Sequence, residues 1–205
     1  QRSMSTFLGA ASLLESADIS REAVQSGAVL FLEGYLFDRD EAKAAFKMAS
    51  KYAHEAGRKV ALTLSDSFCV DRHREDFLDL ILNDIDVLFC NEFELQSLYQ
   101  TSYEEALEQL RSDCEFGAVT RDKRGSVVIN GHDLVHIEPE PVDWVIDATG
   151  AGDQYAAGFL YGFTRGMAIE HCGRLGSMSA SEVITHVGPR PLVQLSTLIP
   201  EHLRS

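Results

Sequence analysis

The segment Asp147-Ala148-Thr149-Gly150-Ala151-Gly152-Asp153 holds two glycines and two carboxylates. It follows the strand-like run Trp144-Val145-Ile146 and precedes a helical pattern over residues 151 to about 165. Small residues let the backbone approach an anion, and the unpaired amides at the start of a helix attract it together with the helix dipole. We therefore predict a phosphate or oxyanion seat at this strand-to-helix turn.

Short apolar runs and longer helical patterns alternate along the rest of the 205-residue chain. Strands are predicted over residues 28–32, 59–64, 86–90 and 116–120, and helices over residues 41–56, up to about 82, 92–99, 103–111 and 168–186. Asn130-Gly131-His132 separates two further apolar runs, residues 125–129 and 133–137, and Asn-Gly in such a place signals a hairpin. The pattern indicates an α/β fold with a mostly parallel sheet and an antiparallel edge.

The glycine turn is the best candidate site, because ligands of parallel α/β sheets bind beyond the carboxyl ends of the strands. It has neither the GxxxxGK[ST] pattern nor the third glycine of a dinucleotide turn, so a Rossmann-type oxidoreductase is a remote alternative. Asp153 is either an acid that interacts with the helix dipole, worth about 0.3–1 kcal/mol, or a reacting group. The two glycines and the nearby Asp147 favour a reacting group.

The charge balance excludes several classes of partner. Lys and Arg number 18 against 32 Asp and Glu, which gives a formal net charge of −14. Such a chain repels nucleic acids and anionic membranes, so we expect neither as a partner. An apolar fraction of 45% with 24% charged residues is typical of a globular protein, and the length fits one domain over residues 1–205.

The cysteines and histidines do not form a recognisable metal or disulfide pattern. Cys69, Cys90, Cys114 and Cys172 are far apart, so we expect buried, reduced thiols. Five histidines have no metal-ligand spacing among themselves and are expected to be exposed or structural: His54, His73, His132, His136 and His171. Trp144 is expected to pack. No apolar run reaches roughly 18 residues and no signal-peptide pattern opens the chain, so we expect a cytoplasmic protein.

The beginning of the chain is unusual. Gln1-Arg2-Ser3-Met4 lacks an initiator methionine and leads into an Ala- and Leu-rich helical pattern without a preceding strand. We expect the chain to begin inside a longer protein.

Residues 147–153, continued by Gln154-Tyr155-Ala156-Ala157-Gly158-Phe159, resemble the DTxGAGDxF signature of the ribokinase-like, pfkB-type kinases. The resemblance implies that Asp153 is the catalytic base. It also implies that the Gly150-Ala151-Gly152 amides hold phosphate charge in the transition state.

Two motifs that precede this segment in the sequence occur in the same order as in the family. Asn91-Glu92-Phe93-Glu94 resembles the NxxE motif, which implies that Glu94 helps to position hydrated Mg²⁺ and phosphate; the alternative is a helix cap by Asn91. Residues 120–125 resemble the TxGxxG turn near the ribose and phosphates of the nucleotide, which assigns Thr120 and Gly125 to it; the alternative is a polar loop.

Three positions depart from the usual family pattern. Asp122 stands where glycine is usual, Ala148 replaces threonine, and Tyr155 replaces phenylalanine. The last two changes remove no reacting group.

Residues 180–191 resemble the last helix and glycine turn of the family, which flank the adenine and a monovalent-cation site. This resemblance assigns Ser181 and Gly188 to the nucleotide site. It also places Asp147, Thr149 and Gly188 around a cation such as K⁺.

The resemblance spans nearly all of the chain but only the later part of a typical family member. It implies a three-layer ribokinase-like fold without its amino-terminal strands and lid, and it allows a homodimer of the intact protein. Arg2 and Glu33-Gly34-Tyr35 resemble the adenosine-kinase-like branch, in which an arginine at the first position could contact the transferring phosphate.

The function that the resemblance implies is transfer of the γ-phosphoryl group of ATP, with Mg²⁺, to a primary hydroxyl of a small-molecule acceptor. An adenosine-like nucleoside is favoured, and a general sugar kinase of the fructose, ribose or ketodeoxygluconate type is the alternative. A nucleotide-binding protein without catalysis is a further alternative, although a pure binder has no need of Asp153. We expect the chain alone to be inactive if much of the acceptor pocket lies outside it.

Overall fold

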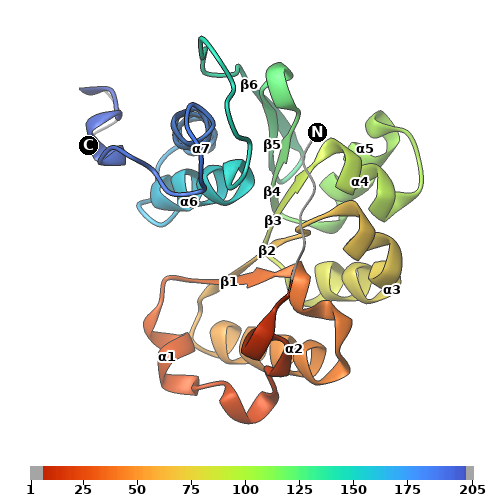
Figure 1. Cartoon of the computed structure of the whole chain (residues 1–205). Coiled ribbons are helices and arrows are strands. Elements are labelled where there is room, and N and C mark those ends of the chain that lie inside the picture. The colour runs from red at the N-terminus through yellow and green to blue at the C-terminus, as the bar shows by residue number, and fades with distance from the viewer. Residues whose placement is uncertain (1–6, 202–205) are drawn as a thin grey trace.

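The computed structural model describes residues 7–201 as a six-stranded sheet with helices on both faces (Figure 1). The strands lie in sequence order, the first four parallel and the last two antiparallel to their neighbours. They are β1 (Val29–Glu33), β2 (Lys59–Thr63), β3 (Val87–Asn91), β4 (Phe116–Thr120), β5 (Ser126–Asn130) and β6 (Asp133–Ile137). The predicted parallel sheet with an antiparallel edge hairpin is confirmed.

The helices form two layers around the sheet (Figure 1). One face packs against α2 (Asp40–Glu55), α3 (Ser67–Asp84), α4 (Glu92–Tyr99) and α5 (Tyr103–Asp113), and the other against α6 (Ala151–Phe163) and α7 (Ile169–Val183). Because side chains alternate along a strand, Leu88 enters the first core while Val87 and Phe89 enter the second. Burial on both faces explains why these strands read as continuous apolar runs.

The prediction of a strand at Trp144-Val145-Ile146 is wrong. These residues belong to an irregular segment, and the Ile146 amide donates to the Ile184 carbonyl at 2.8 Å. Pro139 and Pro141 lack the amide that strand pairing requires, so the approach to this run cannot extend a ladder. Trp144 is 80% exposed, so the expectation that it packs is also wrong.

The Ala- and Leu-rich run near the start of the described residues forms short 3₁₀ helices instead of the predicted α-helix. These are η1 (Gly9–Leu13) and η2 (Ser16–Asp18), and the short helix α1 (Arg21–Ser26) follows them. Gly9 takes a φ of +59°, which lies outside the α-helical region.

Two later helices end earlier than predicted. The structure ends α6 at Phe163 and α7 at Val183. Gly166, with a φ of +69°, then turns the chain between them.

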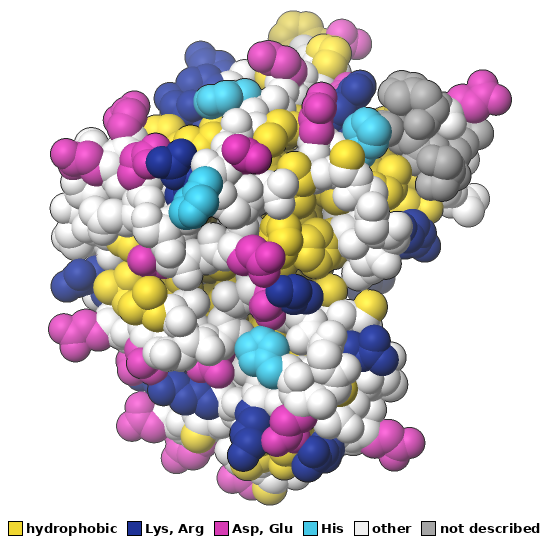
Figure 2. All heavy atoms as spheres, turned by 180° about the vertical axis from the view of Figure 1, so that it is seen from behind, with side chains coloured by type: hydrophobic (Ala, Val, Ile, Leu, Met, Phe, Trp, Pro, Cys, Tyr) yellow, Lys and Arg dark blue, Asp and Glu magenta, His cyan; other side chains and the backbone are white. Residues whose placement is uncertain are grey.

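Strand β1 lies at the edge of the sheet. It pairs with β2 on one side, and no strand of the described residues pairs with its other side. Val29, Phe31, Leu160 and Phe163 are only partly buried there. Figure 2 shows apolar side chains gathered in the hollow between the α6–α7 side of the molecule and the β1–α1 side.

The carboxylate of Asp86, just before β3, holds together the amino-terminal ends of neighbouring strands. It accepts hydrogen bonds from the Val60 amide at 2.8 Å and from Lys59 Nζ at 2.9 Å, and His54 Nε2 lies 3.0 Å away. Burial alone would raise the pKa of Asp86, but Lys59, the Val60 amide and His54 together lower it below its ordinary value. One side chain therefore joins β2, β3 and α2.

We predict that Asp86→Asn lowers the free energy of unfolding by about 1–2 kcal/mol near pH 7, because it weakens hydrogen bonds to a charged group. A carboxyl group whose pKa is lowered in the folded state stabilises the fold at pH values above its ordinary pKa. This contribution disappears as the pH falls through the folded-state pKa. Urea unfolding should therefore show that the free energies of unfolding of Asp86→Asn and the parent chain differ near pH 7 and differ less near pH 3. Asp133→Asn, on the exposed edge of β6, is the matched control.

The four cysteines are all buried, as predicted. His54 and His73 pair with Asp86 and Asp38 respectively, which agrees with a structural role for both. Within residues 7–201, no helix is both long and apolar enough to cross a membrane.

Candidate active site

The last residues of the four parallel strands meet at one edge of the sheet. Glu33, Thr63, Asn91 and Thr120 end β1 to β4 in turn, and all four line a cavity of about 560 Å³. Parallel strands bring their carboxyl ends together, which is why the site forms here.

The predicted anion seat lines the same cavity. Gly150 caps α6 with a φ of +82°, and a Cβ at this position would lie 2.6 Å from Cβ of Pro189. A Cβ on Gly152 would meet no atom within 4 Å, so this backbone is open to a ligand. The amides of Gly152 and Asp153 belong to the first turn, where the helix supplies no acceptor. The Gly150-Ala151-Gly152 turn can therefore receive an anion.

Asp153 is exposed in the first turn of α6, and it lines the same cavity as Glu33, the last residue of β1. Burial, and then the negative charge of Asp153, raise the pKa of Glu33 at the end of β1. Two carboxylates from opposite walls thus lie within electrostatic reach of each other. The arrangement can hold and move a proton beside the anion seat.

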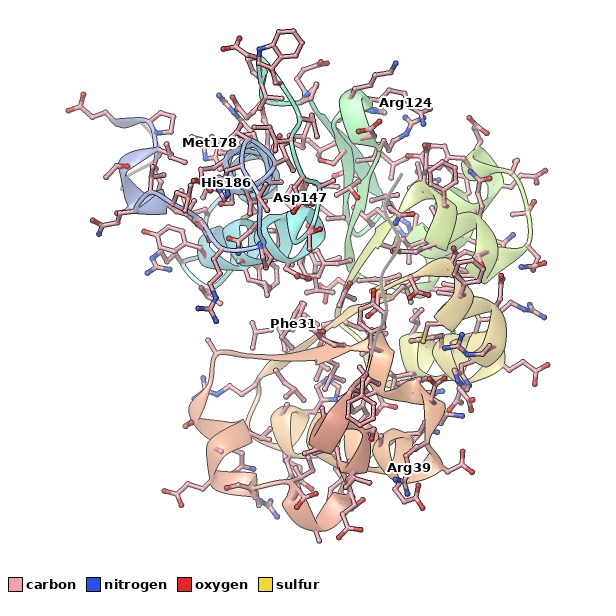
Figure 3. The ribbon with its side chains drawn as sticks, viewed as in Figure 1. Phe31, Arg39, Arg124, Asp147, Met178 and His186 are labelled. Atoms are coloured by element: carbon pink, nitrogen blue, oxygen red, sulfur yellow. The ribbon has the colours of Figure 1, made fainter. Side chains whose placement is uncertain are left out.

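The Asp147 carboxylate ties the glycine turn to the turn after α7. One oxygen accepts from the Thr149 amide at 2.9 Å and from Thr149 Oγ1 at 2.6 Å, and the other accepts from the Gly188 amide at 3.1 Å. Figure 3 shows Asp147 on the irregular segment that leads into α6, beside α7. The three residues that were predicted to surround a cation therefore lie together.

Asn91 and Glu94 form a reciprocal cap at the start of α4. Asn91 Oδ1 accepts from the amides of Phe93 and Glu94, and Glu94 accepts from the Asn91 amide at 2.9 Å and from Nδ2 at 2.6 Å. Glu94 is only 7% exposed, and burial raises its pKa to about 7. The helix-cap interpretation is confirmed, and the same two residues line the cavity. A role of Glu94 toward Mg²⁺ stays a prediction.

The turn after β4 carries two residues in the left-handed region. Asp122 has a φ of +53° and Gly125 a φ of +75°, and a Cβ on Gly125 would lie 2.0 Å from the Ile137 carbonyl. Thr120 Oγ1 donates to the Cys90 carbonyl at 3.4 Å, across β3 and β4. Aspartate tolerates the left-handed region better than most residues, so the turn keeps its shape without the usual glycine.

A second cavity, of about 370 Å³, opens on the other side of this turn. Its walls are largely apolar and include Val142, Val145 and Ile184, with Ser181 among them. The side chain of Ser181 donates to the Met178 carbonyl within α7. The two cavities adjoin, because six residues line both: Thr120, Asp122, Ala148, Ala151, Gly152 and Tyr155.

The larger cavity is strongly acidic. The described residues contribute five carboxylates and one cationic side chain to its walls: Glu33, Glu92, Glu94, Asp122, Asp153 and Arg121. Oxygen donors of this kind suit Mg²⁺. No group of three or more potential metal ligands exists among the described residues, so a metal ion here would need ligands from phosphate and water as well.

Sequence reasoning missed the ion pairs that support this wall. Glu92, only 8% exposed, pairs with Arg124 and lies 3.6 Å from Arg121, whose guanidinium stacks 4.1 Å above the ring of Tyr103. Figure 3 shows Arg124 at the tip of the turn between β4 and β5. The position of these residues at the ends of β3 and β4 was the available signal.

Comparison with known proteins decides the family. The model of the pfkB family carbohydrate kinases matches residues 1–195. The chain belongs to this family. Among solved structures, this pfkB chain is similar to an adenosine kinase from Sinorhizobium meliloti, with 44% identity and a TM-score of 0.88 over 91% of the chain and 58% of that protein.

Two further proteins to which the pfkB chain is similar are named sugar kinases. A probable sugar kinase from Rhizobium etli has 43% identity and a TM-score of 0.89 over 91% of the chain and 57% of that protein. An uncharacterized sugar kinase from Archaeoglobus fulgidus is 35% identical over 114 residues, which are 55% of the chain and 45% of that protein. The chain therefore spans about half the length of the relatives it matches. Arg2, the predicted phosphate contact, lies outside the described residues.

Proposed function

We propose that this chain is the nucleotide-binding and catalytic part of a kinase that transfers the γ-phosphoryl group of ATP to a primary hydroxyl of a sugar or nucleoside. The observation that carries the proposal is Asp153, a carboxylate of the acidic cavity that lies beside the open amides of the glycine turn. Ala151 and Gly152 of this turn also line the apolar cavity. The apolar cavity suits a nucleobase, and the glycine turn suits phosphates.

Each residue of the site has its own role in this proposal. Asp153 accepts the proton of the attacking hydroxyl, and the open amides of Gly152 and Asp153 stabilise charge on the transferred phosphoryl group. The Ala151 amide of the predicted Gly150-Ala151-Gly152 set donates to the Ala148 carbonyl at 3.3 Å. Glu94 would orient water on a bound Mg²⁺, and the metal ion would neutralise phosphate charge. Burial and the charge of Asp153 raise the pKa of Glu33, so Glu33 holds a proton more readily than an ordinary glutamate and can form a hydrogen bond with a hydroxyl near Asp153.

An adenosine-like acceptor is the finer proposal, and it is supported by the similarity to the S. meliloti protein named an adenosine kinase. A general sugar kinase is the second candidate, supported by the similarity to the two proteins named sugar kinases. K⁺ near Asp147, Thr149 and Gly188 is also proposed, since these residues are joined by hydrogen bonds. A homodimer and a cytoplasmic location stay predictions.

The test is calorimetric titration of ATP into the chain with and without Mg²⁺, near pH 8, where Glu94 is ionised. We expect binding that depends on Mg²⁺, because five carboxylates repel a free triphosphate. Glu94→Gln should weaken MgATP binding roughly 10–100-fold, as loss of a group that orients metal ligands does. Glutamine keeps the helix cap, so folding is preserved.

Glu104→Gln, in the exposed first turn of α5, is the control and should bind like the parent chain. ATP binding that needs no Mg²⁺ would contradict the role of Glu94. Equal affinities of Glu94→Gln and Glu104→Gln for MgATP would contradict it as well. Acceptor-dependent release of ADP then separates a kinase from a nucleotide-binding protein without catalysis, which binds ATP and releases nothing.

A further inference from the structure

The residues that line both cavities form the junction between them, and one of these residues bears a carboxylate. Of the six residues that line both cavities, only Asp122 carries a carboxylate; the others are Thr120, Ala148, Ala151, Gly152 and Tyr155. The phenol of Tyr155 is buried and bonded to Ser126 at 2.7 Å, and burial raises its pKa, so it stays neutral.

The turn does not need this carboxylate. Its backbone closes through three bonds, from the Gly125 amide to the Asp122 carbonyl at 3.0 Å, from Arg124 to Arg121 at 3.1 Å and from Arg121 to Gly125 at 2.8 Å. No hydrogen bond or ion pair joins the exposed Asp122 carboxylate to another residue within 7–201. Glycine or asparagine would adopt the same left-handed conformation at least as easily.

The neighbouring cations do not neutralise Asp122. Arg124 pairs with Glu92, and Arg121 stacks on Tyr103 and lies near Glu92, so both are engaged on the α4–α5 side of the sheet. Lys123 lines the apolar cavity and makes no ion pair with a described residue. The carboxylate of Asp122 is therefore a free acceptor at the junction.

A nucleotide that places its base in the apolar cavity and its phosphates on the glycine turn must pass its sugar through this junction. A carboxylate repels phosphate but accepts hydrogen bonds from hydroxyl groups, and its two oxygens match a vicinal diol. The ribose is the part of the nucleotide that offers such a diol.

We propose that Asp122 is a specificity residue that accepts hydrogen bonds from the ribose 2′- and 3′-hydroxyls and so selects ribonucleotides over 2′-deoxyribonucleotides. The proposal rests on the nucleotide-binding function proposed above, and it adds a discrimination that a glycine at this position cannot supply.

The experiment titrates MgATP and Mg-2′-dATP, without acceptor, into the parent chain and into Asp122→Gly, Asp122→Asn and the control Asp133→Asn. We expect the parent chain and the control to bind ATP roughly tenfold more tightly than 2′-dATP, as loss of a hydrogen bond to a charged group implies. Asp122→Gly should bring the ratio close to one, mainly by weakening ATP, and Asp122→Asn should be intermediate. Circular dichroism confirms that each variant folds.

The outcomes separate the two proposals. Failure of the parent chain to bind either nucleotide overturns the proposed function. Binding of both with equal affinity, or a preference that survives in Asp122→Gly and Asp122→Asn, overturns only the role of Asp122. Tighter binding of both nucleotides by the same factor in Asp122→Gly also overturns it, because the carboxylate would then act only by repelling phosphate.

Discussion

Replacing Asp153 with asparagine is expected to lower kcat for phosphoryl transfer by roughly 100- to 10,000-fold, the usual contribution of a general base. The measurement is acceptor-dependent release of ADP by the natural protein. MgATP binding should be kept or slightly strengthened, because the exposed carboxylate has no partner on the nucleotide side and its loss removes a negative charge.

The control for this variant is Asp133→Asn on β6, away from both cavities, which should keep full activity. Substantial activity in Asp153→Asn would show that Asp153 is not the base. The double variant Glu33→Gln/Asp153→Asn then tests whether Glu33, the nearest carboxylate on the facing wall, has taken over the proton.

Gly158→Ala is expected to lower the free energy of unfolding by about 2–3 kcal/mol, the range of overpacking in a close-packed interior. A Cβ on Gly158 would lie 2.3 Å from the Leu175 carbonyl and 2.5 Å from Ser179 Oγ, and the backbone of α7 cannot retreat as a side chain can. Ser179 is already bonded to that carbonyl at 2.9 Å. For a chain of this size, the loss corresponds to a fall in Tm of roughly 5–10 °C.

Gly152→Ala is the matched control for stability, because it lies in the same helix and its Cβ would meet no atom within 4 Å. Its free energy of unfolding should stay within about 0.5 kcal/mol of the parent chain. Equal Tm values for Gly158→Ala and Gly152→Ala in thermal denaturation would contradict the close packing of α6 on α7.

The elements whose pattern is local were predicted well from sequence. Residues 92–99 carry their own cap in Asn91, so the bounds of α4 agree with the prediction. The hairpin of β5 and β6 likewise has its own turn in Asn130-Gly131. Trp144-Val145-Ile146 has strand-like composition, but no neighbouring strand accepts it, and composition alone cannot show the absence of a partner.

The candidate site divides in the same way. The glycine turn and the Asn91–Glu94 pair could be found from contiguous residues. The ion pair of Glu92 with Arg124 and the stacking of Arg121 on Tyr103 join positions far apart in sequence, brought together by the pairing of Asn91 with Thr120 in β3 and β4. The position of Asp122 between two cavities likewise depends on tertiary structure.

No strand of residues 7–201 pairs with the outer side of β1, and this matters for work with the isolated chain. Val29–Glu33 is an apolar strand with a single charge at its end, and its free backbone groups are a template for pairing with another molecule. Such an edge drives concentration-dependent self-association, so binding measurements on this chain are best made with dilute protein whose molecular mass has been checked by light scattering.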